Sequence, residues 1–351
     1  MSVGAASRPV PPAPHTDAEL EERLSRPTPE VAQALRTTPG DVIVLGAGGK
    51  MGPSLTAMLV RAAQTIGDSR RVIAVSRWNN AADAARLETM GAHLIRADLL
   101  EPQAIEQLPD APNVIFMVGQ KFGTRDAPAL TWMTNTVLPA RAAERYRDSR
   151  IVAFSTGNVY ALSPISRSGS VEEDTLSPIG EYAASCVGRE RVFEYAAARW
   201  STRVAMLRLN YAVDLRYGVL VDLARRILAG EAIDLRMGYV NCIWQGDANA
   251  MALRALAHAS APPFAINVTG PERLSVREVA REMGRLLGRE PQLVGHEADD
   301  ALLSDTQRGQ ALFGAPSVAA TTLIAWVVEW VLGGGRTLGR ATSFERRDGS
   351  F

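Results

Sequence analysis

Cysteine and lysine are both scarce in this chain of 351 residues. Its two cysteines, Cys186 and Cys242, are too few for a disulfide framework and lack the spacing of metal ligands. We therefore expect a reduced protein in the cytoplasm, without a metal. The only lysines are Lys50 and Lys121, and every other basic residue is an arginine.

Long apolar runs and an excess of charge are also missing. No uncharged apolar run approaches the roughly 18 residues that a membrane span needs, so no membrane segment is expected. The N-terminus lacks the charged-then-apolar order of a secretory signal. The formal net charge is +0, which gives no electrostatic reason to expect nucleic acid or a membrane surface as a partner.

One stretch near the N-terminus organises the chain. The apolar run Val42–Leu45 leads directly into a glycine-rich loop, and a helical pattern follows from Ser54. Such a run is typical of a buried parallel strand, and glycines let the backbone approach a ligand closely. The N–H groups at the start of a helix can then bind a diphosphate, although a flexible turn is the alternative. We predict that the cofactor is contacted by Gly46, Gly49, Lys50, Met51 and Gly52.

Strand and helix patterns alternate from residue 41 onward. This order predicts an α/β fold with a doubly wound parallel sheet, Rossmann-like, and helices on both faces. The predicted strands are Val42–Leu45, Arg71–Ser76, His93–Ala97, Asn113–Val118, Ile151–Ser155 and Val204–Leu209. The predicted helices between them span 53–66, 80–90, 101–107, 128–147 and 179–200.

The alternation loosens beyond residue 210, where shorter elements follow, among them a strand at Phe264–Val268. We interpret this part as a smaller α/β C-terminal lobe that covers the ligand-binding edge of the sheet. The predicted segments are an N-terminal arm with short helices (1–40), a dinucleotide-binding domain (41–210), a mainly substrate-binding lobe (211–335) and a loose tail (336–351). The arm can lie against the main domain or against a partner subunit.

The strand at Ile151–Ser155 introduces further motifs. It continues into Ser155-Thr156-Gly157-Asn158-Val159-Tyr160, and Tyr182 follows near the start of a long helix. With the glycine loop, Asp98, Asn135, Glu190 and Arg208-Leu209-Asn210, these motifs resemble the extended short-chain dehydrogenase/reductase family, which includes nucleotide-sugar epimerases and dehydratases. The resemblance covers most of residues 41–335.

The resemblance implies a hydrogen bond from Thr156 to the substrate oxygen and proton transfer by Tyr182. Free tyrosine has a pKa of about 10, so the family supplies a lysine four residues later to stabilise the phenolate. Here that residue is Cys186, which cannot supply a positive charge. Another cation can take over, Tyr182 can act as a neutral hydrogen-bond donor, or the site can be catalytically silent.

Lys121 is the best candidate for the substitute cation. It follows the strand at Asn113–Val118, in a loop that resembles the cofactor-contacting loop of UDP-glucose 4-epimerases. A solvated surface lysine is the alternative. Arg189, on the same helical face as Tyr182, is a second candidate. Cys186 itself can be a nucleophile or, as we favour, a small packed residue.

Cofactor choice is expected at the end of the second strand. Ser76 and Arg77 stand where NAD-preferring relatives carry a carboxylate, so we favour NADP over NAD. The resemblance implies that Asp98 reaches the adenine. It also implies cofactor contacts from Val118, Gly119, Lys121, Asn135 and Tyr182.

For the substrate, the resemblance implies contacts from Thr156, Asn210, Arg216 and Tyr239. We therefore predict an NAD(P)-dependent oxidoreductase or epimerase that acts on a hydroxyl or carbonyl carbon of a sugar-like small molecule. The alternative is a catalytically silent NAD(P)-binding sensor or scaffold. A homodimer through the helices at 128–147 and 179–200 is the default for the family.

Overall fold

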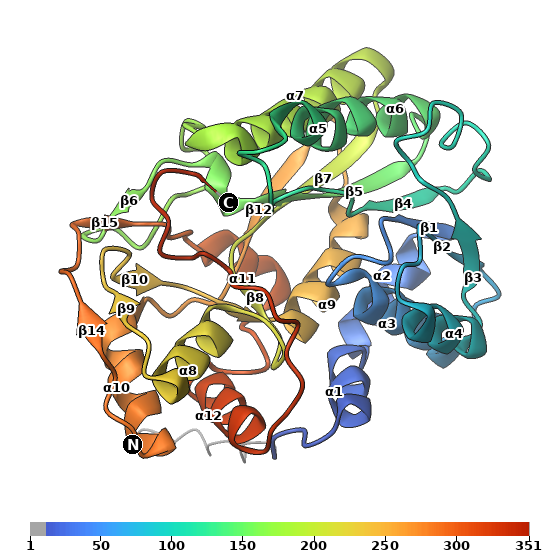
Figure 1. Ribbon diagram of the computed structural model, residues 1–351. Coiled ribbons are helices and arrows are strands. Elements are labelled where there is room, and N and C mark those ends of the chain that lie inside the picture. The colour runs from blue at the N-terminus through green and yellow to red at the C-terminus, as the bar shows by residue number, and fades with distance from the viewer. Residues whose placement is uncertain (1–11, 351) are drawn as a thin grey trace, which may run out of the picture.

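A seven-stranded sheet forms the centre of the computed structural model, which describes residues 12–350 (Figure 1). Its strand order is β12-β7-β5-β4-β1-β2-β3, and all neighbouring strands are parallel. In chain order the strands are β1 (Val42–Leu45), β2 (Val72–Ser76), β3 (His93–Arg96), β4 (Asn113–Phe116), β5 (Arg150–Thr156), β7 (Arg203–Leu209) and β12 (Phe264–Val268). The prediction of a doubly wound parallel sheet is confirmed.

Strand β1 shows how the sheet buries both of its faces. Val42 and Val44 pack into one hydrophobic core, whereas Ile43 and Leu45 pack into another, because successive side chains of a strand point to opposite faces. A strand that is buried on both sides reads as a continuous apolar run. This is why the run at Val42–Leu45 identified the strand.

Helices cover both faces of the sheet (Figure 1). The helices on one face are α2 (Pro29–Thr37), α3 (Gly52–Thr65), α4 (Ala81–Met90) and α9 (Gln245–Ala255), and those on the other are α5 (Pro128–Trp132), α6 (Leu138–Arg145) and α7 (Gly180–Trp200). A single π-helical turn, η1 (Met133–Val137), joins α5 to α6. Such turns are rare and occur frequently at functional sites.

A third hydrophobic core, here called the lobe core, lies beside the carboxyl edge of the sheet. It is built by α1 (Asp17–Leu24), α8 (Val219–Ala229), α10 (Val276–Leu287) and α12 (Ala320–Leu332). Leu20 and Leu24 of α1 are fully buried there, so the arm packs on its own chain. Residues 1–11, the start of the predicted arm, lie outside the described residues.

The C-terminal segment 336–350, here called the C-terminal strap, has no regular secondary structure but is not loose as expected. Phe344 is only 1% exposed and belongs to the lobe core. Thr342 donates two hydrogen bonds to Asp222 Oδ2, from its backbone N (2.7 Å) and from Oγ1 (2.6 Å). Glu345 also forms an ion pair with Arg226. The expectation failed because composition alone did not reveal these few anchoring side chains.

Two further expectations need correction. Residues 101–107 form turns and no helix. The strand at Phe264–Val268 was placed in the C-terminal lobe, yet it pairs with β7 as an edge strand of the main sheet. Parallel pairing across a long connection leaves no local signal for that position.

The remaining elements are short. They are β6 (Ser163–Pro164), β8 (Ala212–Val213), β9 (Ile233–Asp234), β10 (Tyr239–Val240), β11 (Ile243–Trp244), β13 (Leu274–Ser275), β14 (Leu293–Val294), β15 (Asp300–Ala301), η2 (Gly157–Val159), η3 (Leu256–His258) and α11 (Gln307–Phe313). No helix in residues 12–350 is long and apolar enough to cross a membrane.

Candidate active site

A polar groove runs along the carboxyl ends of β1, β2 and β4. We call it the cofactor groove, because many of the predicted cofactor residues line it. Strand β1 has β2 on one side and β4 on the other, which is the switch point where doubly wound sheets bind ligands. The predicted cofactor residues that line the groove are Gly46, Gly49, Ser76, Arg77, Asp98, Val118, Gly119 and Lys121.

The glycine loop of this groove cannot hold larger residues. Gly46 has φ +89°, and a Cβ there would lie 2.9 Å from the backbone N of Val118. A Cβ on Gly52 would clash with the backbone of Ala47. No side chain caps the N-terminus of α3, so its free N–H groups remain available to an anion. These features fit the diphosphate of a dinucleotide.

The part of the groove that follows β2 and β3, here called its far end, contains one basic and one acidic side chain. Arg77 lies 3.8 Å from Asp98, and its side chain is 63% exposed. An exposed pair at this distance contributes little stability, so the guanidinium is available to a bound ligand. Asp98 also accepts a hydrogen bond from the backbone N of Leu100.

The loop after β4 is held in place by Asn135, which lies in the π-helical turn. Its side-chain amide bonds to both backbone groups of Gln120, accepting from N at 2.8 Å and donating to O at 2.9 Å. Asn135 is fully buried and lines neither cavity of the site. It acts on the site through the loop that carries Lys121.

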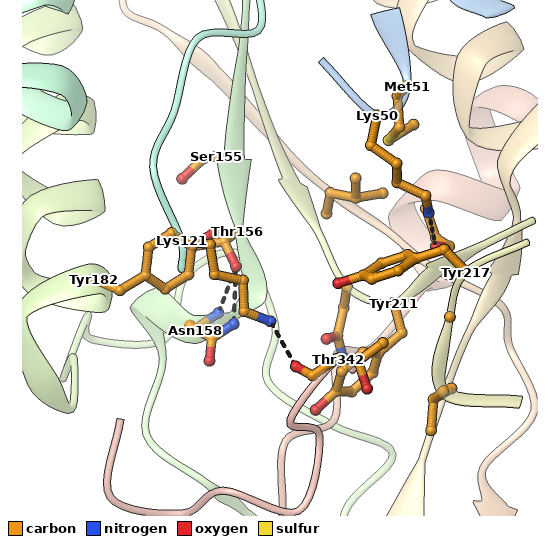
Figure 2. Close-up of a pocket in the computed structure, with 15 residues that line it drawn as sticks. Lys50, Met51, Lys121, Ser155, Thr156, Asn158, Tyr182, Tyr211, Tyr217 and Thr342 are labelled. Atoms are coloured by element: carbon orange, nitrogen blue, oxygen red, sulfur yellow. Dashed lines mark hydrogen bonds between the residues drawn. The ribbon is translucent and has the colours of Figure 1, made fainter. Parts of the chain in front are cut away.

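A second cavity opens beside the groove (Figure 2). Lys121 lines both the cavity and the groove. Its predicted members are Lys50, Met51, Lys121, Thr156, Tyr182 and Asn210. Among those that complete it are Asn158, Tyr211, Tyr217 and Thr342. We call this cavity the substrate pocket.

Tyr182 and Thr156 lie together in the substrate pocket (Figure 2). Burial raises the pKa of Tyr182 above its usual value, and Cys186 raises it further, while a hydrogen bond with Thr156 opposes the shift. Thr156 Oγ1 also accepts hydrogen bonds from Asn158 N at 3.2 Å and Asn158 Nδ2 at 3.0 Å. The phenol is therefore protonated at neutral pH.

Cys186 is fully buried beneath Tyr182, among Val159 and Tyr160. Burial raises the pKa of its thiol, which is the opposite of what a nucleophilic cysteine needs. It is also not part of the pocket lining. These observations favour the packing interpretation of Cys186.

Lys121 reaches across the pocket toward the C-terminal strap. Its Nζ lies 3.5 Å from Thr342 O and 6.0 Å from the centroid of the Tyr182 ring. Burial lowers its pKa to about 8, against an opposing effect of Asp222. The other candidate cation, Arg189, is buried and donates to the Phe154 carbonyl and to Asn135.

Lys50 turns into the same pocket from the glycine loop (Figure 2). Its Nζ donates to Ala212 O at 2.7 Å and lies 4.6 Å from the centroid of the Tyr217 ring. Burial lowers its pKa to about 8. Lys50 was predicted as a cofactor residue, and this placement brings its ammonium group to the substrate pocket.

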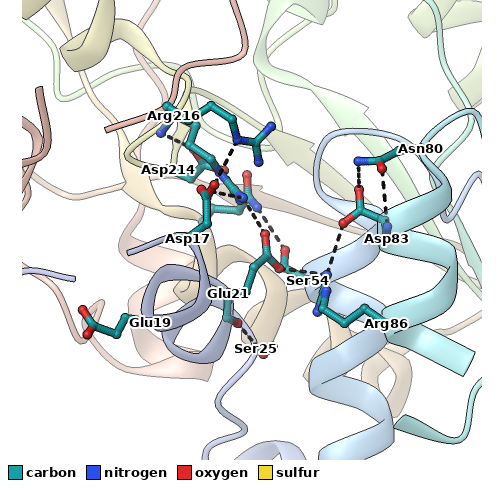
Figure 3. A network of polar contacts seen from close by, with 12 residues as sticks. Asp17, Glu19, Glu21, Ser25, Ser54, Asn80, Asp83, Arg86, Asp214 and Arg216 are labelled. Atoms are coloured by element: carbon teal, nitrogen blue, oxygen red, sulfur yellow. Dashed lines mark hydrogen bonds and ion pairs between the residues drawn. The ribbon is translucent and has the colours of Figure 1, made fainter. Parts of the chain in front are cut away.

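Two predicted substrate residues line neither cavity. Arg216 is buried in a polar network with Asp214 and Glu21 that ties α1 to the segment after β8 (Figure 3). Tyr239 lies in β10, where its ring is covered by Arg273. Both contact protein groups in the described part of the chain.

A buried ion pair connects the strands and the helix that carry several residues of the pocket. Arg208 Nη2 lies 2.7 Å from Glu190 Oε2, and both side chains are buried. Ser155 Oγ donates to the same carboxylate at 2.5 Å, and Arg208 also donates to the Tyr160 hydroxyl. The pair joins β7 to α7, and through Ser155 to the end of β5.

A comparison with models of protein families identifies the family of this chain. Residues 42–260 match the model of the NAD dependent epimerase/dehydratase family. The chain belongs to this family. The predicted resemblance and the prediction of a nicotinamide-dependent enzyme are thereby confirmed at the level of the family.

Solved structures with the same fold include three sugar-nucleotide enzymes. A UDP-glucose 4-epimerase from Thermotoga maritima is 17% identical, with a TM-score of 0.69, and the match covers 84% of this chain and 99% of that one. A UDP-glucuronic acid 4-epimerase from Bacillus cereus with NAD is 14% identical (TM-score 0.69; 84% and 99% covered). A dTDP-glucose 4,6-dehydratase from Streptomyces venezuelae with NAD bound is 18% identical (TM-score 0.69; 83% and 97% covered). At these identities the likeness concerns the fold. No curated protein matches the chain.

The sequence analysis did not identify some of the residues that line the substrate pocket. Tyr211 adopts φ +47°, an uncommon conformation for a bulky residue, and no local sequence signal announces it. Thr342 lies 221 positions from Lys121 in the sequence. The sequence analysis predicted Lys50 and Lys121 as separate cofactor residues and did not predict that both line one cavity.

Proposed function

We propose that the protein is an NAD(P)-dependent oxidoreductase or epimerase acting on a hydroxyl or carbonyl carbon of a sugar-like small molecule. One observation carries the proposal: Thr156 and Tyr182 face a pocket that shares Lys121 with the cofactor groove. A substrate carbon in this pocket lies next to the end of the groove. The fold relatives named above are enzymes of UDP- or dTDP-sugars, which supports a sugar-like substrate.

The side chains suit the handling of one proton. A nicotinamide in the groove would supply or accept the hydride. Thr156 and Tyr182 bind the oxygen of the reacting carbon, and Tyr182 exchanges the proton. Because the pKa of Tyr182 is raised, the phenol suits proton donation to a carbonyl oxygen, which is the reductive direction. In the oxidative direction the phenol must lose its proton. The charge of Arg189 lowers the pKa of Tyr182 and favours that loss, and we propose that Lys121, whose Nζ lies 6.0 Å from the ring centroid, adds to this effect.

We further propose a preference for NADP. Arg77 at the far end of the groove is mostly exposed and offers a charged partner for a 2′-phosphate. Ser76 next to it carries no charge that would repel the phosphate. The fold relatives with a bound nicotinamide contain NAD, so the support for NADP comes from the residues of this chain alone.

We also propose a homodimer in the cytoplasm. Trp132 of α5 and Val137 of the π-helical turn are apolar side chains that are each 38% exposed. Burial of exposed apolar side chains against a second copy stabilises an assembly. Sedimentation of the purified protein measures the oligomeric state, and a monomer at micromolar concentration would contradict this part.

The decisive experiment measures turnover with reduced and oxidised cofactors over a panel of hydroxyl and keto sugars. We expect Tyr182→Phe to lower kcat by about 100-fold or more, because proton transfer contributes at least that much. Cofactor affinity should stay unchanged. Tyr195→Phe is the matched control, since Tyr195 lies on the same helix and is 61% exposed.

A catalytically silent NAD(P)-binding protein is the second candidate, and Cys186 in place of the family's lysine favours it. Such a protein binds cofactor with the same affinity in the Tyr182→Phe variant and turns over none of the panel. That result would overturn the enzymatic proposal.

A further inference from the structure

The substrate pocket combines two ammonium groups with no acid. Lys50 and Lys121 reach into it from different loops (Figure 2). None of the residues of the described chain that line it is an aspartate or a glutamate. The pocket wall is otherwise made of hydroxyl, amide and apolar groups.

Lys50 has donors to spare. An ammonium group carries three N–H donors, and within residues 12–350 the side chain makes one hydrogen bond, to Ala212 O. Its second neighbour is the face of the Tyr217 ring, which attracts a cation without accepting a full hydrogen bond. The remaining N–H groups are available to a ligand.

The acids that face the two lysines are engaged elsewhere. Asp214, whose charge acts on Lys50, is bound by Arg216 through both the guanidinium and the backbone N, and Arg216 opposes its effect. Asp222, whose charge acts on Lys121, accepts two hydrogen bonds from Thr342. Neither carboxylate lines the pocket.

We propose that the pocket binds its substrate through an oxyanion, a carboxylate or a phosphate ester, held by Lys50 and Lys121. The substrate is then an acidic sugar-like compound. This inference rests on the proposed function and names its substrate class. The cavity measures about 160 Å³, which is below the few hundred Å³ typical of larger ligands. The charged group therefore lies close to the reacting carbon.

The electrostatics of the free protein agree with this assignment. Burial lowers the pKa of both lysines to about 8, and Lys121 also lowers that of Lys50 by repulsion. A bound anion favours the charged form of each lysine and therefore raises both pKa values. Anion binding should accordingly weaken as the pH rises through about 8.

The scarcity of lysine makes this measurable directly. Lysine labelled with ¹³C at Cε gives signals from only two side chains in the whole protein. Their pH titrations are recorded for the protein alone and with glucuronate, glucose 6-phosphate or glucose at tens of millimolar. We expect one of the two acids to raise both pKa values and glucose to leave them unchanged. The acid that does so distinguishes a carboxylate site from a phosphate site.

The variant Lys50→Met assigns the signals and tests the role of this lysine. Loss of one charge-assisted contact should weaken binding of the effective acid by about tenfold or more. Arg281→Met, which removes an exposed cation from α10, is the control and should leave binding unchanged. Titrations that neither acid moves, or acid binding unaffected by Lys50→Met, would overturn the proposal.

These readouts do not depend on turnover. If an acid raises the pKa values of the lysines but the protein shows no turnover, the anion site is supported and the enzymatic proposal is overturned. If the protein turns over neutral sugars but neither acid changes the pKa values of the lysines, the enzymatic proposal is supported and the anion site is overturned.

Discussion

The cofactor groove and the substrate pocket lie side by side but are built differently. The groove is formed mainly by the ends of β1, β2, β3 and β4 and by the loops that follow them, with contributions from α5, the π-helical turn, α6 and Arg340 of the C-terminal strap. The pocket also uses the segment around Tyr211, the start of α8 and Thr342 of the C-terminal strap. The groove is therefore set mainly by the sheet, with one strap residue in its lining, whereas the pocket depends more on segments brought together only by the complete fold.

The largest effect is expected at the buried pair of Arg208 and Glu190, which joins β7 to α7 and, through Ser155, to the end of β5. Arg208→Met leaves Glu190 buried without its partner, which costs roughly 3–5 kcal/mol of the free energy of unfolding. Chemical denaturation measures the loss, and both cofactor and substrate binding should decline. The double variant with Glu190→Gln should lose less than the single variants predict when added, because no unpaired charge remains. Strict additivity would contradict the coupling.

The same difference explains how far the sequence could predict the structure. The strand at Val42–Leu45 and the turn at Gly46 could be predicted from contiguous residues, because a buried strand and a tight turn each restrict which residue types can occur locally. Local sequence also suggested that Thr156 and Tyr182 belong together through a known motif. It carried no information on Thr342, whose position depends on the anchoring of a distant strap. It likewise could not tell that Lys50 turns toward Ala212.

The second prediction separates the pocket from the sheet by loosening the C-terminal strap. Phe344→Ala removes a buried anchor, which costs up to roughly 3–5 kcal/mol if the site cannot relax. Because the strap can open locally, the effect should appear mainly as faster hydrogen exchange over residues 336–350 and a KM raised about tenfold. Cofactor affinity should fall less than substrate affinity, because Arg340 is the one strap residue that lines the groove.

Leu338→Ala is the control for the strap, since this side chain is 39% exposed. It should leave both hydrogen exchange and KM near their original values. If Phe344→Ala weakened cofactor and substrate binding equally, the groove would depend on the strap as much as the pocket does, and the contrast between the two regions would disappear.

The third prediction concerns the groove alone. A Cβ at residue 52 would lie 2.6 Å from the backbone C of Ala47, so Gly52→Ala should cost about 1–3 kcal/mol through overpacking. At residue 49 the nearest atom is Gly46 O at 3.3 Å, which is tight but tolerable. Gly49→Ala should therefore keep its melting temperature while losing cofactor affinity. Equal melting temperatures for the two variants would contradict the steric argument.

The smallest effect is expected at the far end of the groove, where we propose that a single exposed side chain selects the cofactor. Arg77 pairs with Asp98 at 3.8 Å, a contact weak enough to be exchanged for a 2′-phosphate. Arg77→Ser should lower the affinity for NADP about tenfold, since one charge-assisted hydrogen bond of roughly 1.5 kcal/mol is lost. The affinity for NAD, measured by the same fluorescence titration, is the internal control and should not change. If both affinities stay the same, Arg77 does not select the cofactor, and the groove owes its binding to the glycine loop that the sheet positions.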